Sequence, residues 1–317
     1  MPSFTQLEYI VKVAELRHFG KAAEACHVSQ PSLSMQIQKV EDEIGFILFD
    51  RIKKPIVPTS KGLLFIEQAK IILREQHKLM DLAKKSENEI SGEFSLGIIP
   101  TLAPYVLPLF LKDFSEKYPK VNLKINELKT NEIIDYLNQD KLDAGILATP
   151  LGESGLIEQV LFYENFLVYV SQEHQLSKRK KIKEEELDGS ELWLMEDGHC
   201  LRNQVVRVCS LNRKNKGVYR NIQFESGNLE TLCHLVKSGR GYTLVPQLFV
   251  EQLGHNETQK YIREFENPAP AREVSLVYRR EQWKADILGG MALTILDSLP
   301  KSVQKSFERK KIQVIKL

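Results

Sequence analysis

The sequence has few of the features that restrict a protein's location by themselves. Four cysteines in 317 residues are too few for a disulfide-stapled scaffold. No apolar run approaches the ~18 residues that a membrane span needs. The amphipathic N-terminal segment is interrupted by charges, unlike a signal peptide. We therefore expect a cytoplasmic protein without a membrane partner, and in that reducing compartment a close thiol pair is more often chemical than structural.

The chain also lacks an excess of charge of one sign. Its 44 Lys and Arg nearly balance 42 Asp and Glu, which leaves a formal net charge of +2. A basic surface for nucleic acid would therefore have to be local. The 42% hydrophobic content is ample for buried cores, and the length suggests two or three domains.

The N-terminal residues are typical of short helices followed by a basic turn. Ser29 stands where a helix N-cap belongs, and Pro31 falls in the first turn, where proline is tolerated. The helix that follows has one apolar face and one small polar face, which is the arrangement expected of a helix-turn-helix. The basic tripeptide behind it is either a solvated loop or a wing that contacts phosphate. We predict a winged helix-turn-helix over residues 1–58, with DNA contacts from Ser29, Gln30, Pro31, Ser32, Ser34, Gln38, Arg51, Lys53 and Lys54.

The remaining chain divides by pattern into a long helix and an α/β region. Residues 59–90 predict a helix of roughly 30 residues whose apolar stripe indicates dimerisation, followed by a hinge at "SENEISGE". From Phe94 onward strands and helices alternate, which favours a mostly parallel α/β domain. We expect lobe I at residues 91–162 and 268–302, lobe II at 163–267, and a basic tail at 303–317.

Two cysteines stand close together in "MEDGHCLRNQVVRVC". Cys200 would lie in the first turn of a helix, where free backbone N–H groups and the helix dipole stabilise a thiolate. His199 and Arg202 could add positive charge or donors. Metal binding is disfavoured because no second Cys/His pair has ligand spacing. Cys209 could equally be a small hydrophobic residue packed among valines.

The spacing of these cysteines conflicts with a simple disulfide. On an intact helix they are about 13.5 Å apart along the axis, whereas a disulfide needs Cα atoms about 4.4–6.8 Å apart. The two thiols can therefore join only if the helix unwinds or is not continuous. If it is continuous, bond formation would force a large local rearrangement, which is the behaviour of a two-state switch.

Several segments together resemble the LysR-type transcriptional regulators. They are "FGKAAEACHVSQPSLSMQIQKVEDEIGFILFDR", "PTSKG" and "GNLETLCHLVKSGRGYTLVP". The resemblance covers essentially the whole chain. It implies a winged helix-turn-helix, a long linker helix and a two-lobed, periplasmic-binding-protein-like α/β regulatory domain. It also implies dimers or tetramers on double-stranded promoter DNA, contact with RNA polymerase, no cofactor and no enzyme activity.

Within this family, "EDGHCLRNQVVRVC" and "IPTLAPYVLP" resemble the peroxide-sensing OxyR branch. That resemblance implies hydrogen peroxide as the signal, Cys200 as the peroxidatic and Cys209 as the resolving cysteine. It also implies a peroxide pocket lined by Thr101, Thr130, His199 and Arg272. Asn203 departs from the branch, in which this position is often acidic.

Without the resemblance, the same pocket residues have ordinary interpretations. Thr101 and Thr130 would be helix caps, and Arg272 would form a surface ion pair just before the last strand. Cys26 and Cys233 fall on the apolar phases of their helices and are expected to be buried and inert.

Three other functions remain open at this level. The nearest is a LysR-type regulator that binds a small carboxylate or aromatic effector between the lobes and has unreactive cysteines. A thiol peroxidase would share the cysteine chemistry, but the helix-turn-helix argues against catalysis as the main role. A solute-binding protein would share the two lobes but should carry an export signal and no DNA-binding head.

Overall fold

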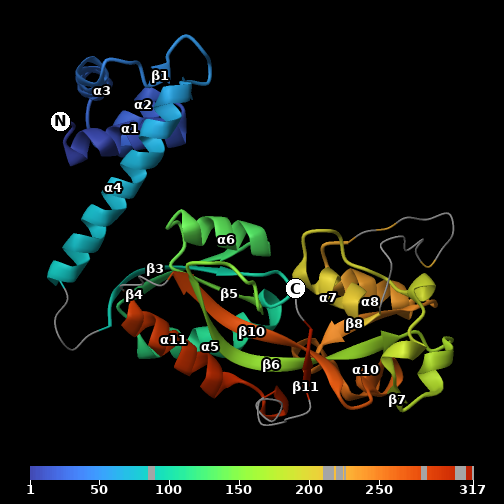
Figure 1. Ribbon diagram of the computed structural model, residues 1–317. Helices are drawn as coiled ribbons and strands as arrows, with labels where there is room; N and C mark the ends of the chain where they lie inside the picture. The colour runs from blue at the N-terminus through green and yellow to red at the C-terminus, as the bar shows by residue number, and fades with distance from the viewer. Residues whose placement is uncertain are drawn as a thin grey trace. The chain divides into compact units, whose positions relative to one another are not determined.

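The computed structural model describes residues 1–84, 90–209, 218, 224, 226–279, 284–303 and 312–315. They belong to two compact units, Met1–Glu89 and Ile90–Leu317 (Figure 1). Part of the predicted hinge and most of the predicted basic tail lie outside the described residues. Among the described helices, none is both long enough and apolar enough to cross a membrane.

The N-terminal unit packs three short helices around one core and adds a small hairpin. Ser29 caps the third helix by accepting a hydrogen bond from the Ser32 amide, with Pro31 in the first turn, as the sequence predicted. Leu33 and Ile37 of that helix are fully buried. The predicted wing is confirmed as an antiparallel hairpin. The elements are α1 (Phe4–Leu16), α2 (Phe19–Ala25), α3 (Gln30–Ile44), β1 (Phe49–Asp50) and β2 (Val57–Pro58).

The long helix α4 (Ser60–Lys84) differs from its prediction in length and in the use of its apolar stripe. It has 25 residues, and residues 85–89 lie outside the described ranges. Part of the stripe is buried within the unit, because Ala69 and Leu73 pack with Leu7 of α1. Only the remainder is exposed, most of all Leu64 and Leu79. Dimerisation therefore does not have to account for every apolar residue of this helix.

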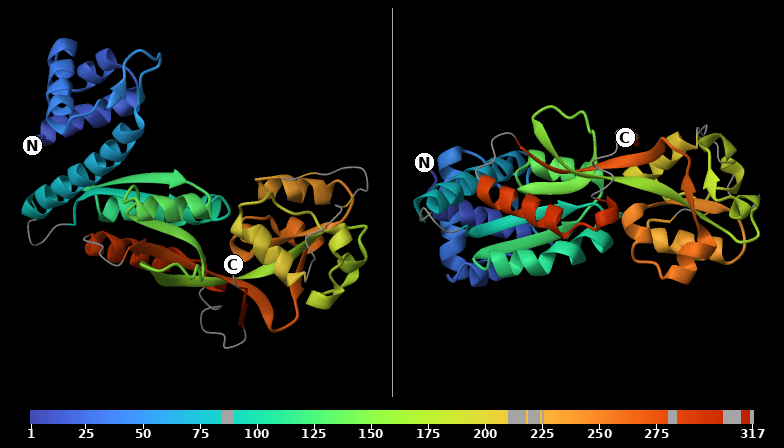
Figure 2. Two further views of the ribbon diagram at one scale, coloured as in Figure 1. Left: turned by 45° about the horizontal axis from the view of Figure 1, so that its top comes forward. Right: turned by 90° about the horizontal axis from the view of Figure 1, so that it is seen from below.

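The C-terminal unit is built on a mixed sheet with two long strands, β6 (Leu156–Val170) and β10 (Ala269–Arg279). They pair antiparallel and run through both lobes, as Figures 1 and 2 show. The prediction of a mostly parallel domain is wrong, because a chain that leaves one lobe on β6 and returns on β10 must reverse its direction. Parallel pairing occurs between β3 and β4, β3 and β5, β7 and β9, and β10 and β11.

The shorter elements divide between the two ends of these strands. Lobe I contains β3 (Gly92–Ile98), α5 (Ala103–Lys117), β4 (Val121–Glu127), α6 (Thr130–Asn138), β5 (Ala144–Thr149) and α11 (Ala285–Ser298). Lobe II contains β7 (Lys181–Ile182), α7 (Cys200–Val208), α8 (Leu229–Lys237), β8 (Tyr242–Pro246), α9 (Gln247–Val250), α10 (His255–Tyr261) and β9 (Ile262–Phe265). The short strand β11 (Ile312–Val314) lies beside β10.

Two glycines set the position of α6 on its sheet. A Cβ atom at Gly97 of β3 would lie 2.7 Å from Leu142 Cδ1 and 3.1 Å from Ile133 Cγ1, and one at Gly145 of β5 would overlap Ile133 Cγ2. Side chains at either position would push α6 away from the sheet. The close approach fixes the first residue of α6, Thr130, at the edge of lobe I.

One predicted strand of lobe II does not form. The segment "LWLM" makes only isolated bridges, from Leu192 to Tyr242 and from Met195 to Ser226. Its apolar residues are nevertheless buried in the core. An apolar run of this length indicates burial, but it does not by itself give a ladder partner.

Candidate functional site

Cys200 is the first residue of helix α7, as the sequence predicted. His199 is the N-cap in an extended conformation, and its side chain makes no capping hydrogen bond. The Cys200 side chain is 6% exposed. The sulfur therefore lies at the positive end of a helix dipole, beside backbone N–H groups and away from bulk water.

The turn before Cys200 is held by Gly198 and Arg202. Gly198 has a φ of 93°, in the left-handed region that favours glycine. Arg202 donates to the Met195 carbonyl over 2.6 Å and pairs with Asp197 over 2.7 Å. The Arg202 guanidinium thus anchors the turn.

Two buried polar atoms beside Cys200 lack a hydrogen-bond partner among the described residues. They are Thr130 Oγ1 and His199 Nε2. Thr130 is close enough to the thiol to lower its pKa, and His199 Nε2 lies 3.5 Å from Glu196 Oε1, too far for a strong hydrogen bond. Because buried polar atoms are rarely left unpaired, these two atoms are candidates to bind a small polar ligand.

Arg272 comes to the same place from the sheet. Its side chain is fully buried in β10, so the residue-based alternative of a surface ion pair is wrong. It donates from Nη1 to Thr101 Oγ1 and from Nη2 to the Thr101 carbonyl, each over 3.1 Å. The helix-cap alternative for the two threonines is also wrong, because Leu102 and Lys129 are the N-caps of α5 and α6.

Burial and local donors act in opposite directions on the Cys200 thiol. Burial is the larger effect and raises its pKa above the usual value. The Arg272 charge, the Thr130 hydroxyl and the backbone amides of Leu201 and Cys200 each lower it. The site therefore keeps a thiol protonated at rest but holds four groups that favour the thiolate.

His199 is held in its neutral form. Burial lowers its pKa most, and the Lys129 ammonium lowers it further, against the opposing effect of Glu196. Lys129 also binds Glu196 over 2.8 Å, which joins the start of α6 in lobe I to the turn before α7 in lobe II. A neutral imidazole can accept or donate a proton, so His199 is suited to either role beside the sulfur.

Cys209, at the other end of α7, has different surroundings. It is the C-cap residue of the helix and is also 6% exposed. Burial raises the pKa of its thiol to about 12, and only the Tyr242 hydroxyl lowers it. All four cysteines are free. The continuous helix between Cys200 and Cys209 confirms that a bond between them requires α7 to unwind.

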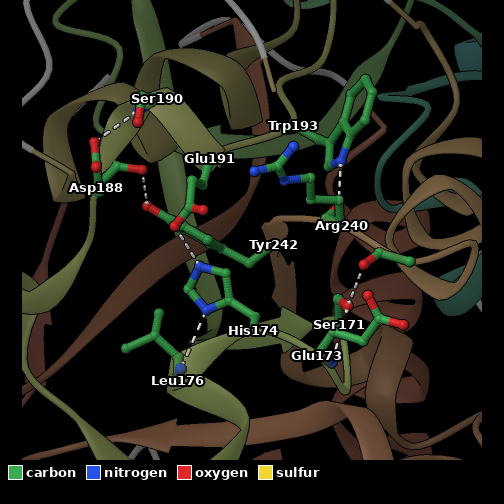
Figure 3. A network of polar contacts seen from close by, with 11 residues as sticks. Ser171, Glu173, His174, Leu176, Asp188, Ser190, Glu191, Trp193, Arg240 and Tyr242 are labelled. Atoms are coloured by element: carbon green, nitrogen blue, oxygen red, sulfur yellow. Dashed lines mark hydrogen bonds and ion pairs between the residues drawn. The ribbon is translucent and has the colours of Figure 1, made fainter. Parts of the chain in front are cut away.

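Tyr242 itself is fixed by a polar network in lobe II (Figure 3). Its hydroxyl donates to the Asp188 carbonyl over 3.0 Å, and its ring meets that of His174 edge-on. His174 Nε2 lies 2.7 Å from Glu191 Oε2, and Trp193 donates to the Arg240 carbonyl over 2.9 Å. Cys209 thus lies beside a tyrosine whose position is held by these contacts.

The other cysteines and Asn203 lie apart from this chemistry. Cys233 is buried as expected, whereas Cys26 is only half-buried. Asn203 is exposed on α7. Glu164, Lys129 and Tyr242 also contact the site residues, and sequence reasoning did not select them. Nothing in the segments that contain them distinguishes a buried partner from an ordinary strand or loop residue.

The predicted DNA-binding residues form two groups in the N-terminal unit. Those of α3 are exposed or half-buried on the face opposite Leu33 and Ile37, and Lys53 and Lys54 are exposed in the wing. Arg51 instead lies against the unit. It binds Glu41 Oε2 over 2.7 Å, donates to Ser34 Oγ over 3.2 Å and stacks over Phe19. Its role in DNA binding would therefore include holding the wing against α3.

Comparison with protein families gives the class. Residues 4–63 match "Bacterial regulatory helix-turn-helix protein, lysR family", and residues 87–286 match the "LysR substrate binding domain". The chain belongs to the LysR family of bacterial DNA-binding transcription regulators.

Individual relatives narrow the comparison within that class. The chain is 37% identical over 273 residues to a hydrogen peroxide-inducible genes activator of Haemophilus influenzae, covering 86% of this chain and 89% of the relative. It is equally similar to the DNA-binding transcriptional dual regulator OxyR of Escherichia coli K12, with 86% and 88% covered. These curated relatives belong to the OxyR branch that the sequence resembles.

Solved structures that are similar to this chain also include OxyR proteins. A full-length OxyR variant of Pseudomonas aeruginosa superposes with a TM-score of 0.73 at 32% identity, covering 93% of this chain and 98% of that one. A peroxide-bound OxyR variant of Corynebacterium glutamicum superposes with a TM-score of 0.60 at 29% identity, covering 96% and 97%.

Proposed function

We propose that this LysR-type regulator senses hydrogen peroxide through Cys200 and transmits the signal by a Cys200–Cys209 disulfide. It would act in the cytoplasm as a dimer or tetramer on promoter DNA, in contact with RNA polymerase. Residues 1–58 would bind DNA, 59–90 would dimerise, and the lobes at 91–162 with 268–302 and at 163–267 would carry the sensor. The relatives named for hydrogen peroxide support this choice of signal.

The observation that carries the proposal is the set of groups around the Cys200 sulfur. A hydrogen peroxide molecule can donate two hydrogen bonds and accept several. The Thr130 hydroxyl and the Arg272 charge both act on the Cys200 thiol and lower its pKa. His199 Nε2, of the preceding residue, is buried without a hydrogen-bond partner among the described residues, and Arg272 also donates to Thr101 Oγ1. A packing cysteine would not need such polar groups near it.

The first step is a displacement on oxygen. The Cys200 thiolate attacks one oxygen of hydrogen peroxide, the S–O bond forms and the O–O bond breaks. The leaving hydroxide takes one proton and departs as water, which leaves Cys200 as a sulfenic acid. Donors at Arg272, Thr101 and Thr130 would stabilise the charge that develops on the leaving oxygen.

The second step supplies the conformational signal. The Cys209 thiolate attacks the sulfenic sulfur, an S–S bond forms, and the hydroxide leaves with a proton as a second water. The bond requires α7 to unwind, which would break the buried contact of Gln204 Nε2 with the Ile315 carbonyl. The resulting change in lobe II would alter how paired regulatory domains pack.

The N-terminal unit would bind DNA, and α4 would pair with a second copy of the chain. The small, exposed face of α3 fits the major groove, and the Lys53 and Lys54 side chains fit the phosphates. Leu63, Leu64 and Leu79 of α4 are more than half exposed, which supports a second copy of the helix as their partner.

Peptide mass spectrometry tests the redox proposal. The reduced protein is treated with one equivalent of peroxide, with Cys200→Ser and the buried but remote Cys233→Ser as matched variants. We expect a Cys200–Cys209 bond in the wild type and in Cys233→Ser and none in Cys200→Ser. Two free thiols in the oxidised wild type would contradict the proposal and favour a regulator with a small-molecule effector. Sustained peroxide consumption with a reductant would favour a thiol peroxidase.

Gel-shift assays test the DNA-binding assignments. Gln38→Ala should weaken binding to the operator by about 1–3 kcal/mol and leave binding to unrelated DNA unchanged, because it removes a base contact. Lys53→Ala should weaken both and lower the salt dependence by about one ion. Equal effects on both DNAs from Gln38→Ala would contradict its placement in the groove.

A further inference from the structure

Beneath Arg272 lies a carboxylate that neither the sequence patterns nor the chemistry above accounts for. Glu164 is fully buried on β6, and its backbone is the direct cross-strand partner of Arg272 on β10. Its Oε1 accepts from Arg272 Nε over 2.6 Å and lies 2.6 Å from Nη2. Neither side chain of the pair is exposed.

The second carboxylate oxygen ties the pair to lobe II. Glu164 Oε2 accepts from the Leu248 amide, in α9, over 3.1 Å. Arg272 reaches the other way and holds Thr101, in the turn that leads to α5 of lobe I. The pair thus connects four segments of the chain at the point where β6 and β10 pass between the lobes.

From these contacts we infer that Glu164 is a positioning residue for the Cys200 reaction. It fixes the plane of the Arg272 guanidinium, and through it the Thr101 hydroxyl, in the geometry that peroxide needs. It also compensates the Arg272 charge, so that the thiol is activated by oriented donors more than by a net positive charge. This inference rests on the proposed peroxide chemistry of Cys200.

The hydrogen bonds explain how Glu164 would orient Arg272, and how Arg272 would in turn orient the Thr101 hydroxyl. A guanidinium is planar, so the hydrogen bond from Nε to Glu164 Oε1, with Nη2 close to the same oxygen, sets the direction of its remaining N–H groups. Thr101 Oγ1 accepts one of those groups, which leaves the hydroxyl proton to donate to another acceptor. A peroxide oxygen beside Cys200 is such an acceptor.

The charge argument gives a separate, measurable consequence. Arg272 is the charged group that lowers the pKa of the Cys200 thiol. Glu164 binds that guanidinium and reduces the positive potential that reaches the sulfur. Removal of the carboxylate charge should therefore favour the thiolate, while loss of the fixed guanidinium should slow the thiolate's attack on peroxide.

The test separates the two effects by measuring two rates against pH in the full-length protein. All variants carry Cys209→Ser, so that only the first step is observed. Alkylation of Cys200 by iodoacetamide gives the midpoint of thiolate formation without peroxide. Oxidation by hydrogen peroxide is followed by trapping of the sulfenic acid and peptide mass spectrometry. The rate constant that it reaches at high pH, its plateau, is that of the fully formed thiolate.

We expect Glu164→Gln to move the alkylation midpoint to lower pH by about one unit and to lower the peroxide plateau about tenfold. Glu164→Asp keeps the charge but retracts the carboxylate, so it should lower the plateau and leave the midpoint in place. Glu158→Gln is the control, because it removes a carboxylate of the same strand that binds the Leu151 amide. It should match the wild type in both measurements.

A wild-type midpoint and plateau in Glu164→Gln would overturn the inference. If that variant does not fold, as judged by near-UV circular dichroism, a wild-type plateau in Glu164→Asp would overturn it instead. A wild-type Cys200 that alkylates normally but does not react with peroxide would contradict the proposed function. In that case the alkylation midpoints of the variants would still test the charge effect of Glu164.

Discussion

The two ends of helix α7 carry the same residue type at the same 6% exposure, yet they differ chemically. Cys200, at the start of the helix, has a buried cation, a hydroxyl and two backbone amides that lower its pKa. For Cys209, at the end of the helix, the Tyr242 hydroxyl is the one group among the described residues that lowers the pKa. Burial alone would make both thiols inert. The direction of the helix and the residues that approach from lobe I and β10 give Cys200 alone several groups that oppose this effect, which is why we propose it as the peroxidatic thiol.

The largest expected effect comes from replacing Cys200, the thiol with more pKa-lowering groups around it. Cys200→Ser should abolish rapid oxidation by peroxide and any disulfide, because each other cysteine has either a cation or a hydroxyl that lowers its pKa, and Cys200 has both. Stopped-flow oxidation followed by thiol counting measures this. Rapid oxidation that persisted in Cys200→Ser would mean that the two ends of α7 do not differ as described.

Replacement of Cys209, at the other end of α7, should separate the two chemical steps. In Cys209→Ser the first oxidation should proceed within about twofold of the wild-type rate, since sites this far apart rarely interact strongly. The sulfenic acid should then persist because no resolving thiol is present. Trapping with dimedone detects it. A first step that slowed as much as in Cys200→Ser would show that the cysteines do not act in sequence.

Thr130→Val tests the difference between the two cysteines by removing one hydrogen-bond donor near Cys200. The Thr130 hydroxyl lowers the pKa of the Cys200 thiol, so its loss should raise that pKa, and less thiolate is then present at neutral pH. The oxidation rate, which rises with pH in the wild type, should fall about tenfold at pH 7 if the pKa rises by about one unit. Thr258→Val, in α10 of lobe II, is the matched control. An unchanged pH profile would contradict the role of Thr130.

The smallest effect is expected from a substitution beside Cys209. Tyr242→Phe removes the hydroxyl that lowers the Cys209 pKa and donates to the Asp188 carbonyl. Disulfide closure should slow several-fold at neutral pH because less Cys209 thiolate forms, and unfolding in urea should cost about 1 kcal/mol less free energy. The first oxidation step serves as the internal control and should not change. Faster closure would instead show that Tyr242 restrains Cys209.

The fold was largely predictable where the signal is local. The Ser29 cap, the Pro31 position and the apolar face of α3 follow from a few neighbouring residues, and the structure confirms them. The start of α7 at Cys200 was likewise predicted from a glycine-containing turn followed by helix-forming residues. The wing hairpin follows from its prolines and basic residues.

The errors occur where distant segments decide the outcome. A parallel sheet was expected from strand–helix alternation, but β6 and β10 pair antiparallel because they carry the chain between lobes in opposite directions. "LWLM" was expected to form a strand, yet its backbone pairing with β8 (Tyr242–Pro246) is an isolated bridge at Leu192 and not a ladder. The α4 stripe was assigned wholly to dimerisation, although α1 covers part of it.

The sequence by itself determined the class of the protein, its helix-turn-helix, and the start of a helix at Cys200. Those features depend on local spacing, which a single chain segment carries. Only the tertiary structure decided which groups surround each sulfur. Thr130 comes from lobe I, and Arg272 comes from β10 with Glu164 opposite it on β6. These residues are far apart in the chain, and the long-range packing of the two lobes brings them together.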